Sequence, residues 1–474
     1  MNQLPRLLLV ALVGALVFAF VATKPAQRSH PLEAFVTYYC GGAAVNAHVD
    51  PYATDFVLRC EDQNEPGLLP PGVVEPAALP PSGLAVFALL ARLPYHLAGK
   101  LFLALSLAAL LGAALAVARV TGLRSAVPFG AFTFLCGFVN LFYGEIVPIV
   151  LFGICFAGWA LARERYALAA VGVAISMFEP HVAIPAALAA FVFVPKMRVP
   201  LAIVALTLVG ASLWLGPQSL WHYGHDVVPL HAWAEISAVD QYSSTWIAHW
   251  LGADDRLALR VGSAFSFAGW IAGIVVAGRI ADRLRAPAAL LYVPVAFSLV
   301  TPLFVHDVQL PLAIPAGLLL ARFGRYPALS WAGVVLSAFP WVPGWFWHPT
   351  YPLLLLAAVA FALGAIVSKR VRAAFVIGLV AAYALIARLL AGAQWTVASN
   401  DAVATLPPDA NPALASLDWG KYIWDGAPSR EITVGLLAGK LLLFAGPAAV
   451  VASALLEMRA PAPAAVRSDQ LEAA

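Results

Sequence analysis

The sequence predicts an all-α, polytopic bundle of about 12–14 transmembrane helices with external loops. Hydrophobic residues make up 62% of the 474 residues, charged residues make up only 11%, and the mean hydropathy is +0.85. Globular domains are usually about 45–50% apolar and about 25% charged. Apolar runs recur along the whole length, and a soluble protein could not bury this much apolar surface. The net charge of +3 is too small to indicate a nucleic-acid partner.

Each long apolar run is interpreted as a membrane helix, because a span needs about 20 apolar residues, or fewer where the helix ends inside protein. The first run follows Arg6 and is either a cleaved signal peptide or a retained signal-anchor, and a polytopic protein favours the anchor. The expected spans are residues 5–22, 96–118, 126–143, 146–162, 167–179, 181–195, 199–215, 260–278, 287–304, 308–321, 327–345, 352–368, 373–392 and 432–456.

The distribution of Lys and Arg predicts the orientation, since cytoplasmic loops carry the excess of both. With the N-terminus inside, the inside segments hold 17 of the 28 basic residues and five of the 25 acidic ones. We therefore expect a multi-pass protein of the cell inner (plasma) membrane with both termini in the cytoplasm. The long polar loops 23–82, 216–259 and 393–431 then fall outside. Because function concentrates on loops held by a scaffold, the working face is expected to be external, or periplasmic in a cell with two membranes.

The chain is expected to have three regions. Residues 1–330 form the transmembrane core with external loops 23–82 and 216–259, and residues 331–456 add C-terminal transmembrane helices with external loop 393–431. The Trp and Tyr residues of that last loop either anchor it at the membrane interface, which we favour, or cap the site. Residues 457–474 are rich in Ala and Pro and are expected to be a disordered cytoplasmic tail.

Two of the four cysteines, Cys40 and Cys60, lie in the first external loop, and the other two lie within predicted helices. An oxidising compartment permits a disulfide between Cys40 and Cys60, and the alternative is two free thiols. The bridge would close a loop of about 20 residues, worth about 3 kcal/mol in the chain-entropy model. It would hold Asp50 and Tyr52 in one rigid hoop.

Charged side chains also mark the external ends of several predicted helices. Glu145 lies in NLFYGEIVP, Glu179 and His181 lie in SMFEPHVAIP, and His306 and Asp307 lie in TPLFVHDVQLP. Ionisable groups at membrane depth are costly and tend to face a cavity or each other. Any one of them is also explained as a helix-end group that reaches water. Together with the first loop, these turns predict one external pocket.

The order of these motifs resembles the GT-C type glycosyltransferases that use polyprenyl-phosphate sugars, and within them glycosyltransferase family 87 with its α-mannosyltransferase-like members. That family opens its first external loop with Asp-Phe-x-x-Tyr-Tyr, small residues and a Pro-Tyr triplet. The matching strings here are AFVTYY at 34–39, GGAA, and DPY at 50–52, followed by LPP at 79–81 in place of Tyr-Pro-Pro.

The later motifs of the family follow in the same order, and the resemblance covers roughly residues 5–330. Its Gly-Gln turn resembles Gly144-Glu145, and its Lys-Pro turn resembles Glu179-Pro180. Its Asn-Gln-Ser segment followed by Arg resembles DQYS at 240–243 followed by His249, and its Ser-Pro-x-x-Trp-Asp/Glu-His turn resembles TPLFVHD at 301–307. The family places a catalytic Asp where this chain has Ala34, so the chain is a distant branch.

The resemblance implies transfer of a mannose-like sugar from a polyprenyl-phosphate donor to an envelope lipid or glycan acceptor, with inversion. No cofactor or metal is implied besides the lipid-linked donor. A carboxylate is needed as general base, and Glu33 is the acid beside position 34, with Asp50 or Asp55 as alternatives. Hydrogen-bond donors such as the histidines would stabilise the leaving phosphate. The expected catalytic residues are Glu33, His306 and Asp307, and the expected substrate-binding residues are Tyr38, Asp50, Tyr52, Glu145, Glu179, His181, Gln241 and His249.

Two other functions are also compatible with the sequence. One is a transporter or flippase of a lipid-linked saccharide, although the sequence shows no internal symmetry of the kind that transporters often have. The other is a catalytically inactive relative with a scaffolding role, which Ala34 favours. The sequence contains no Gly-rich phosphate loop with Lys, no His-Glu-x-x-His, no Cys-x-x-Cys and no Asp-x-Asp motif. The acid pair in GADDRL, at 252–257, is interpreted as a helix start.

Overall fold

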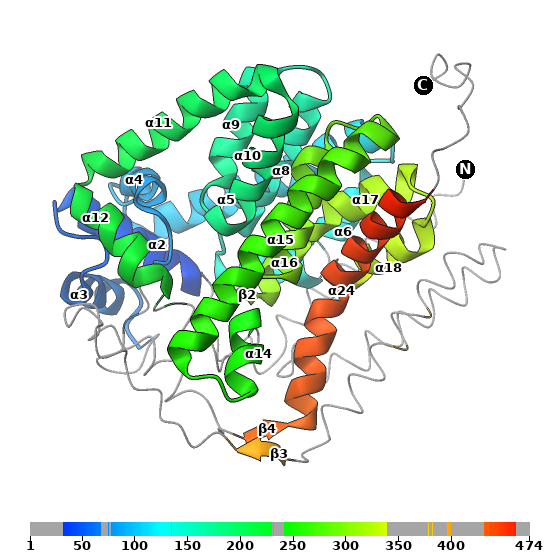
Figure 1. Cartoon of the computed structure of the whole chain (residues 1–474). Helices are drawn as coiled ribbons and strands as arrows, with labels where there is room; N and C mark the ends of the chain where they lie inside the picture. The colour runs from blue at the N-terminus through cyan, green and yellow to red at the C-terminus, as the bar shows by residue number, and fades with distance from the viewer. Residues whose placement is uncertain are drawn as a thin grey trace.

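The computed structural model describes residues 32–67, 74, 77–133, 135–229, 231, 241–338, 378, 382, 396–399 and 431–460. This part of the chain is a bundle of helices with two short strand pairs, which confirms the predicted all-α membrane bundle (Figure 1). The α-helices are α2 (Glu33–Asn46), α3 (Thr54–Asn64), α4 (Pro81–Leu90), α5 (Tyr95–Thr121), α6 (Ala126–Thr133), α7 (Leu135–Tyr143), α8 (Val147–Leu161), α9 (Tyr166–Ser176), α10 (Pro180–Phe193), α11 (Arg198–Trp214), α12 (Pro217–His222), α14 (Ser244–Trp250), α15 (Asp255–Leu284), α16 (Ala289–Val300), α17 (Ile314–Phe323), α18 (Pro327–Ala338) and α24 (Val434–Arg459).

Short turns and strands connect these helices. The 3-10 helices are η1 (Pro195–Met197) and η4 (Asp307–Ala313), and η2 (Tyr223–Val227) is a π-helix. Strand β1 (Gln241–Tyr242) pairs antiparallel with β2 (Val305–His306), so two segments far apart in the sequence lie side by side. Strand β3 (Thr396–Ser399) pairs in the same way with β4 (Glu431–Thr433).

Most of the expected spans within the described residues are single helices, but two are not. The span 126–143 is wrong as one helix, because α6 and α7 divide it. Gly137 of α7 packs so closely on the Phe132 carbonyl that a larger side chain would collide. The span 308–321 is also wrong as one α-helix, because it begins as η4 and continues as α17. Pro311 lies inside η4 and Pro315 lies in the first turn of α17, and neither has a backbone N–H to donate within a continuous α-helix. The spans 5–22 and 352–368 and nearly all of 373–392 lie outside the described residues.

The described residues of the predicted external loop 23–82 are largely helical, which the sequence analysis did not expect. Helix α2 covers most of the polar stretch 33–52, α3 follows it, and α4 begins at the end of the loop. The small residues of α2 explain the packing, because a Cβ on Gly42 would lie 2.5 Å from the backbone carbon of Phe87 in α4. Helix α2 buries side chains on several of its faces, so its polar, aromatic and small residues form a helix that is packed inside the protein.

Sequence signals define many of the helix ends. Prolines stand in the first turn of α4, α8, α10, α12 and α17, where their missing N–H costs nothing. Gly122 ends α5 with a φ of 68°, a conformation that glycine adopts at little cost. The acid pair of GADDRL starts α15 as predicted, since the Asp254 side chain accepts a hydrogen bond from the Leu257 N–H at 2.9 Å.

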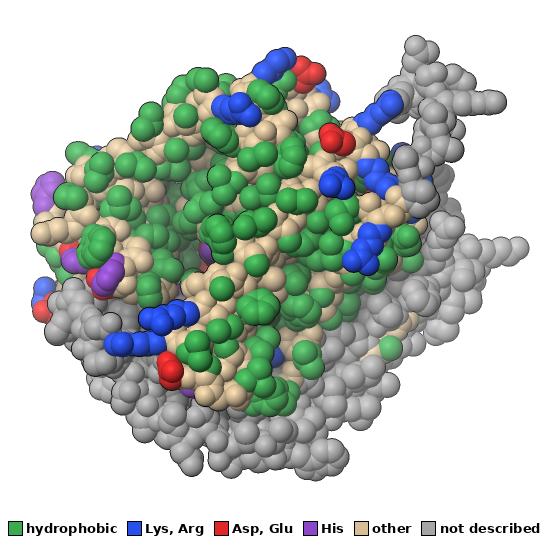
Figure 2. Space-filling view, in the orientation of Figure 1, with side chains coloured by type: hydrophobic (Ala, Val, Ile, Leu, Met, Phe, Trp, Pro, Cys, Tyr) green, Lys and Arg blue, Asp and Glu red, His purple; other side chains and the backbone are tan. Residues whose placement is uncertain are grey.

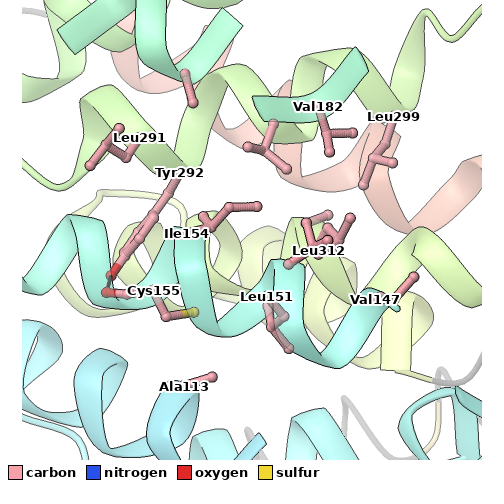
Figure 3. Close-up of a cluster of buried hydrophobic side chains, with 14 of the residues drawn as sticks. Ala113, Val147, Leu151, Ile154, Cys155, Val182, Leu291, Tyr292, Leu299 and Leu312 are labelled. Carbon is pink, nitrogen blue, oxygen red and sulfur yellow. Dashed lines mark hydrogen bonds between the residues drawn. The ribbon is translucent and has the colours of Figure 1, made fainter. Parts of the chain in front are cut away.

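The core lies where α8, α10 and α16 meet η4 (Figure 3). Ile154 of α8 points toward α16, which carries Leu291 and Leu299, whereas Leu151 points to the other side of α8, toward Ala113 (Figure 3). The Tyr292 hydroxyl donates to the backbone oxygen of Cys155 at 3.1 Å, so the buried phenol has a polar partner.

Three helices in the described residues are long and apolar enough to cross a membrane: residues Tyr95–Thr121, Pro195–Trp214 and Arg256–Leu284. Their outward faces carry exposed hydrophobic side chains, such as Leu105, Leu206 and Phe267. Apolar side chains cover most of the described face of the bundle in Figure 2. A surface of this kind faces lipid rather than water, and the protein is therefore a membrane protein.

The C-terminal helix α24 packs against α16 and α18. Its Glu457 carboxylate is 1% exposed and lies 2.9 Å from Arg283 Nε of α15. The same carboxylate accepts a hydrogen bond from the Arg325 N–H at 2.7 Å, just after α17. Residues 457–459, expected in the tail, are therefore helical, because Glu457 has polar partners inside the bundle; residues 461–474 lie outside the described part.

Candidate active site

The site forms where α2 meets the turn between α7 and α8. The Leu32 N–H donates to the Phe142 carbonyl at 2.8 Å, which ties the start of α2 to the end of α7. Gly144 turns the chain with a φ of 72°. From this junction the Tyr38 hydroxyl donates to Glu145 Oε2 at 3.1 Å. Two predicted site residues that are 107 positions apart are thus in direct contact.

Glu179 lies close by, in the turn between α9 and α10. Its Oε2 is 3.3 Å from His181 Nδ1, and its side chain is 16% exposed. The pKa of Glu179 is raised from 4.5 to about 7, chiefly by burial. A hydrogen bond from Gln309 lowers this pKa, the charge of Glu145 raises it, and the charge of His306 lowers it. A carboxyl group with this pKa is partly protonated at neutral pH.

Two histidines lie against the ring of Phe304, and a third lies beside one of them. The centroid of Phe304 lies 5.6 Å from that of His181 and 4.2 Å from that of His231. The rings of His231 and His306 are 5.9 Å apart. Burial lowers the pKa of His231, and positive charge on His306 and His181 would lower it further. These imidazoles therefore influence one another's protonation.

The strand pair β1–β2 brings the loop after α12 into this cluster. Gln241 is the register partner of His306, so the backbones of these predicted residues are adjacent, while the Gln241 side chain lies outside the described part. The Thr245 hydroxyl donates to the Leu303 carbonyl at 3.2 Å. His306 is itself held by its N–H, which donates to the Gln309 side-chain oxygen at 3.1 Å.

The predicted hoop is present beside the cluster. Cys40 and Cys60 form a disulfide with their Cα atoms 5.6 Å apart. Within the hoop, Asp50 Oδ2 lies 2.5 Å from Nδ1 of His222, and Asp50 Oδ1 accepts from the Tyr52 N–H at 3.1 Å.

An aromatic contact connects the hoop to the acids. The buried ring of Tyr52 stacks on Tyr223 at a centroid distance of 6.1 Å. Burial raises the pKa of Tyr223, and the charge of Glu179 raises it further. Tyr223 therefore lies between the hoop and the turn before α10, within range of both.

The remaining predicted residues take other positions. Glu33 is the first residue of α2, and at about 100° per residue it points about 140° away from the direction of Tyr38. Asp55 is exposed on α3, and Asp307 is 4% exposed at the first position of η4. His249 is half-buried on α14.

Sequence reasoning missed several polar residues near this region. His222, Tyr223 and His231 belong to the loop 216–259, and their signal was its richness in His and aromatic residues. Lys440 of α24 is 3% exposed, with its ammonium 4.7 Å from the ring centroid of Trp246. A lone lysine inside an apolar run was the available signal, because such residues are usually functional.

Among the residues that the structure describes, no three His, Cys, Asp or Glu side chains are placed to hold a metal ion. Within the same part of the chain, the buried His181 Nε2 has no hydrogen-bond partner. A buried polar atom without a protein partner is costly, and it suits a position that a substrate group occupies. The arrangement offers carboxylates, imidazoles and tyrosines for acid-base chemistry and anion binding.

The central region of this membrane bundle is similar to a family of glycosyltransferases. The model of glycosyltransferase family 87 matches residues 79–306, just under half of the chain, and this match confirms the predicted resemblance. The matched region includes Glu145, Glu179, His181 and His306, and it excludes α2 and the hoop. No curated protein and no solved structure matches the chain.

Proposed function

We propose that the protein transfers a mannose-like sugar from a polyprenyl-phosphate donor to an envelope lipid or glycan on the external face of the membrane. The observation that carries this proposal is the cluster of Tyr38, Glu145, Glu179, His181 and His306 within a bundle whose central region matches a glycosyltransferase family. The chemistry needs a base for the acceptor hydroxyl and hydrogen-bond donors for the leaving phosphate, and the cluster contains both.

The leaving phosphate is assigned to the histidine side of the cluster. His181 Nε2 is buried and free of hydrogen bonds among the described residues. When the neighbouring Glu179 is protonated, its proton faces His181 Nδ1, so the neutral imidazole carries its own proton on Nε2. That N–H then donates to a phosphate oxygen, and the neutral Glu179 does not repel the anion.

The base is a carboxylate on the side of α2. The sequence favours Glu33, whereas the contacts favour Glu145. In either case, the acceptor oxygen attacks the anomeric carbon from the face opposite the phosphate, and this inverts the centre.

The external location is supported by the two ends of α8, α9 and α10. Glu145 precedes α8 and Glu179 follows α9, whereas Arg163 and Arg165 lie between these helices at their other ends and Lys196 follows α10. The cluster and the basic turns therefore lie at opposite ends of the same helices. Basic turns are typical of the cytoplasmic side.

One reconstitution experiment tests the proposal. The purified protein is placed in liposomes of total membrane lipid with radiolabelled polyprenyl-phosphate mannose. Transfer of label to a lipid or glycan acceptor is expected. Movement of the donor between leaflets without transfer would indicate the transporter, and neither result would favour the inactive relative that Ala34 suggests.

A further inference from the structure

The position of Glu145 is set by close packing rather than by a flexible loop. A Cβ on Gly144 would lie 2.9 Å from Phe35 Cβ and 3.2 Å from Leu32 Cα, so the turn presses directly on the first turn of α2. The backbone N–H of Glu145 donates to the Asn140 carbonyl at 2.9 Å. The carboxylate is therefore anchored where α2, α7 and α8 meet.

The face of α2 that this carboxylate meets is defined by two residues one turn apart. Ala34 and Tyr38 are separated by four positions, so they share a helix face. Tyr38 donates its hydroxyl proton to Glu145 Oε2, and Ala34 adds no charge. The carboxylate on this face thus comes from the neighbouring turn.

The other acids near the cluster suit different roles. Glu179 has a pKa raised to about 7, chiefly by burial, and is therefore only partly ionised at neutral pH. Both oxygens of Asp50 are engaged, one with His222 and one with the Tyr52 N–H. Glu33 points about 140° away from Tyr38 around the helix.

We propose that Glu145 is the general base of the sugar transfer, with Tyr38 as its positioning residue. This assignment rests on the proposed function. Glu145 Oε1 takes the proton of the acceptor hydroxyl while the acceptor oxygen forms its bond to the anomeric carbon. The bond from that carbon to the donor phosphate oxygen breaks, and its electron pair leaves with the polyprenyl phosphate. The carboxylic acid then returns its proton to water.

The test uses three variants in the liposome assay with radiolabelled polyprenyl-phosphate mannose. Glu145→Gln keeps the shape but cannot accept a proton, and transfer should fall by about 100- to 10,000-fold through kcat. Adding Ala34→Asp to that variant should restore a measurable part of the transfer rate, because the new carboxylate lies on the same face of α2 as Tyr38. Glu164→Gln is the matched control, since Glu164 is 77% exposed beyond the other end of α8 and its loss should leave transfer unchanged.

A second measurement guards against a variant that is merely misfolded. Glu145→Asp retains a carboxylate, so it should transfer sugar at a reduced rate that still rises with pH as the carboxyl group ionises. Glu145→Gln has no such group, so this rise of the rate with pH should be absent. Full activity of Glu145→Gln, or loss of activity in Glu33→Gln alone, would overturn the assignment while leaving the proposed function standing. Absence of transfer by the unmodified protein would overturn both.

Discussion

At the scale of single residues, the site depends on side chains whose chemistry is changed by their neighbours. Glu179 is the clearest case, since it lies in a turn that the sequence marks only by Glu-Pro. Burial, the charge of Glu145 and the contact with Gln309 decide its protonation. Neither Glu145 nor Gln309 is close to Glu179 in the sequence.

The raised pKa of Glu179 predicts a stability that depends on pH. The folded protein binds this proton more tightly than the unfolded chain does, with a pKa of about 7 against an ordinary value of 4.5. The contribution of Glu179 to folding is therefore complete below about pH 4.5 and is lost as the pH rises through about 7. The Glu179→Gln variant stays neutral, so its melting temperature should exceed that of the unmodified protein by much more at pH 8 than at pH 5.

The measurement is thermal unfolding in detergent at a series of pH values, taken as the difference between the two proteins. In the unmodified protein, the free energy of unfolding that Glu179 loses over this pH range is at most about 3 kcal/mol for a shift of this size. A difference that does not change between pH 5 and pH 8 would contradict the raised pKa.

At the scale of elements, cross-links between helices hold the site and the end of the bundle that carries Glu457 in place. The Cys40–Cys60 disulfide joins α2 to α3. Glu457 joins α24 to α15 and to the turn after α17. Each link connects segments that local propensity alone would leave independent.

Removing the disulfide should lower stability and loosen the hoop. Cys40→Ser should reduce the free energy of unfolding by about 3 kcal/mol, because the unfolded chain regains the entropy of a 20-residue loop. Thermal unfolding with and without reductant measures the effect. Reductant should lower the melting temperature of the unmodified protein and leave that of Cys40→Ser unchanged; equal shifts in both proteins would place the sensitive bond elsewhere.

Breaking the ion pair of Glu457 should also destabilise the bundle. Glu457→Gln removes the charge that lies 2.9 Å from Arg283 Nε, and losing one member of a buried pair typically costs about 3–5 kcal/mol. The exposed pair of Glu164 and Lys196, 4.0 Å apart with side chains 77% and 70% exposed, is the matched control. Glu164→Gln should change the melting temperature little. Equal effects of the two substitutions would show that burial does not strengthen the inner pair.

At the scale of the whole molecule, charge is divided between the two ends of the bundle. The acids, histidines and hoop lie at one end of α8, α9 and α10, and the basic turns lie at the other. This division predicts the orientation in the membrane.

We expect both termini in the cytoplasm. A fluorescent protein fused at residue 474 should be fluorescent, and alkaline phosphatase at the same place should be inactive, since that enzyme folds only where disulfides form. A phosphatase fusion after Asn64, in the external loop, should be active and serves as the control. The opposite pattern would reverse the topology and place the cluster on the cytoplasmic side.

The sequence by itself determined the class of fold, the position of most described spans, the Cys40–Cys60 pairing and the family resemblance. These depend on signals that are local or compositional: apolar runs, prolines and glycines at helix ends, and cysteines in an external loop. It also predicted that Glu145, Glu179, His181 and His306 share one site, because helix ends on one face of a bundle lie near one another.

Only the tertiary structure decided which of these residues touch and which direction each one faces. It turned residues 33–46 of the expected loop into helix α2, because α4 and α5 pack on its aromatic and small residues, and hydropathy does not report this packing. It separated Glu33 from the Tyr38 face by the angle of the helix and brought Glu145 onto that face across 107 positions. Such contacts depend on how helices distant in sequence pack together, and a linear pattern of residues does not encode that directly.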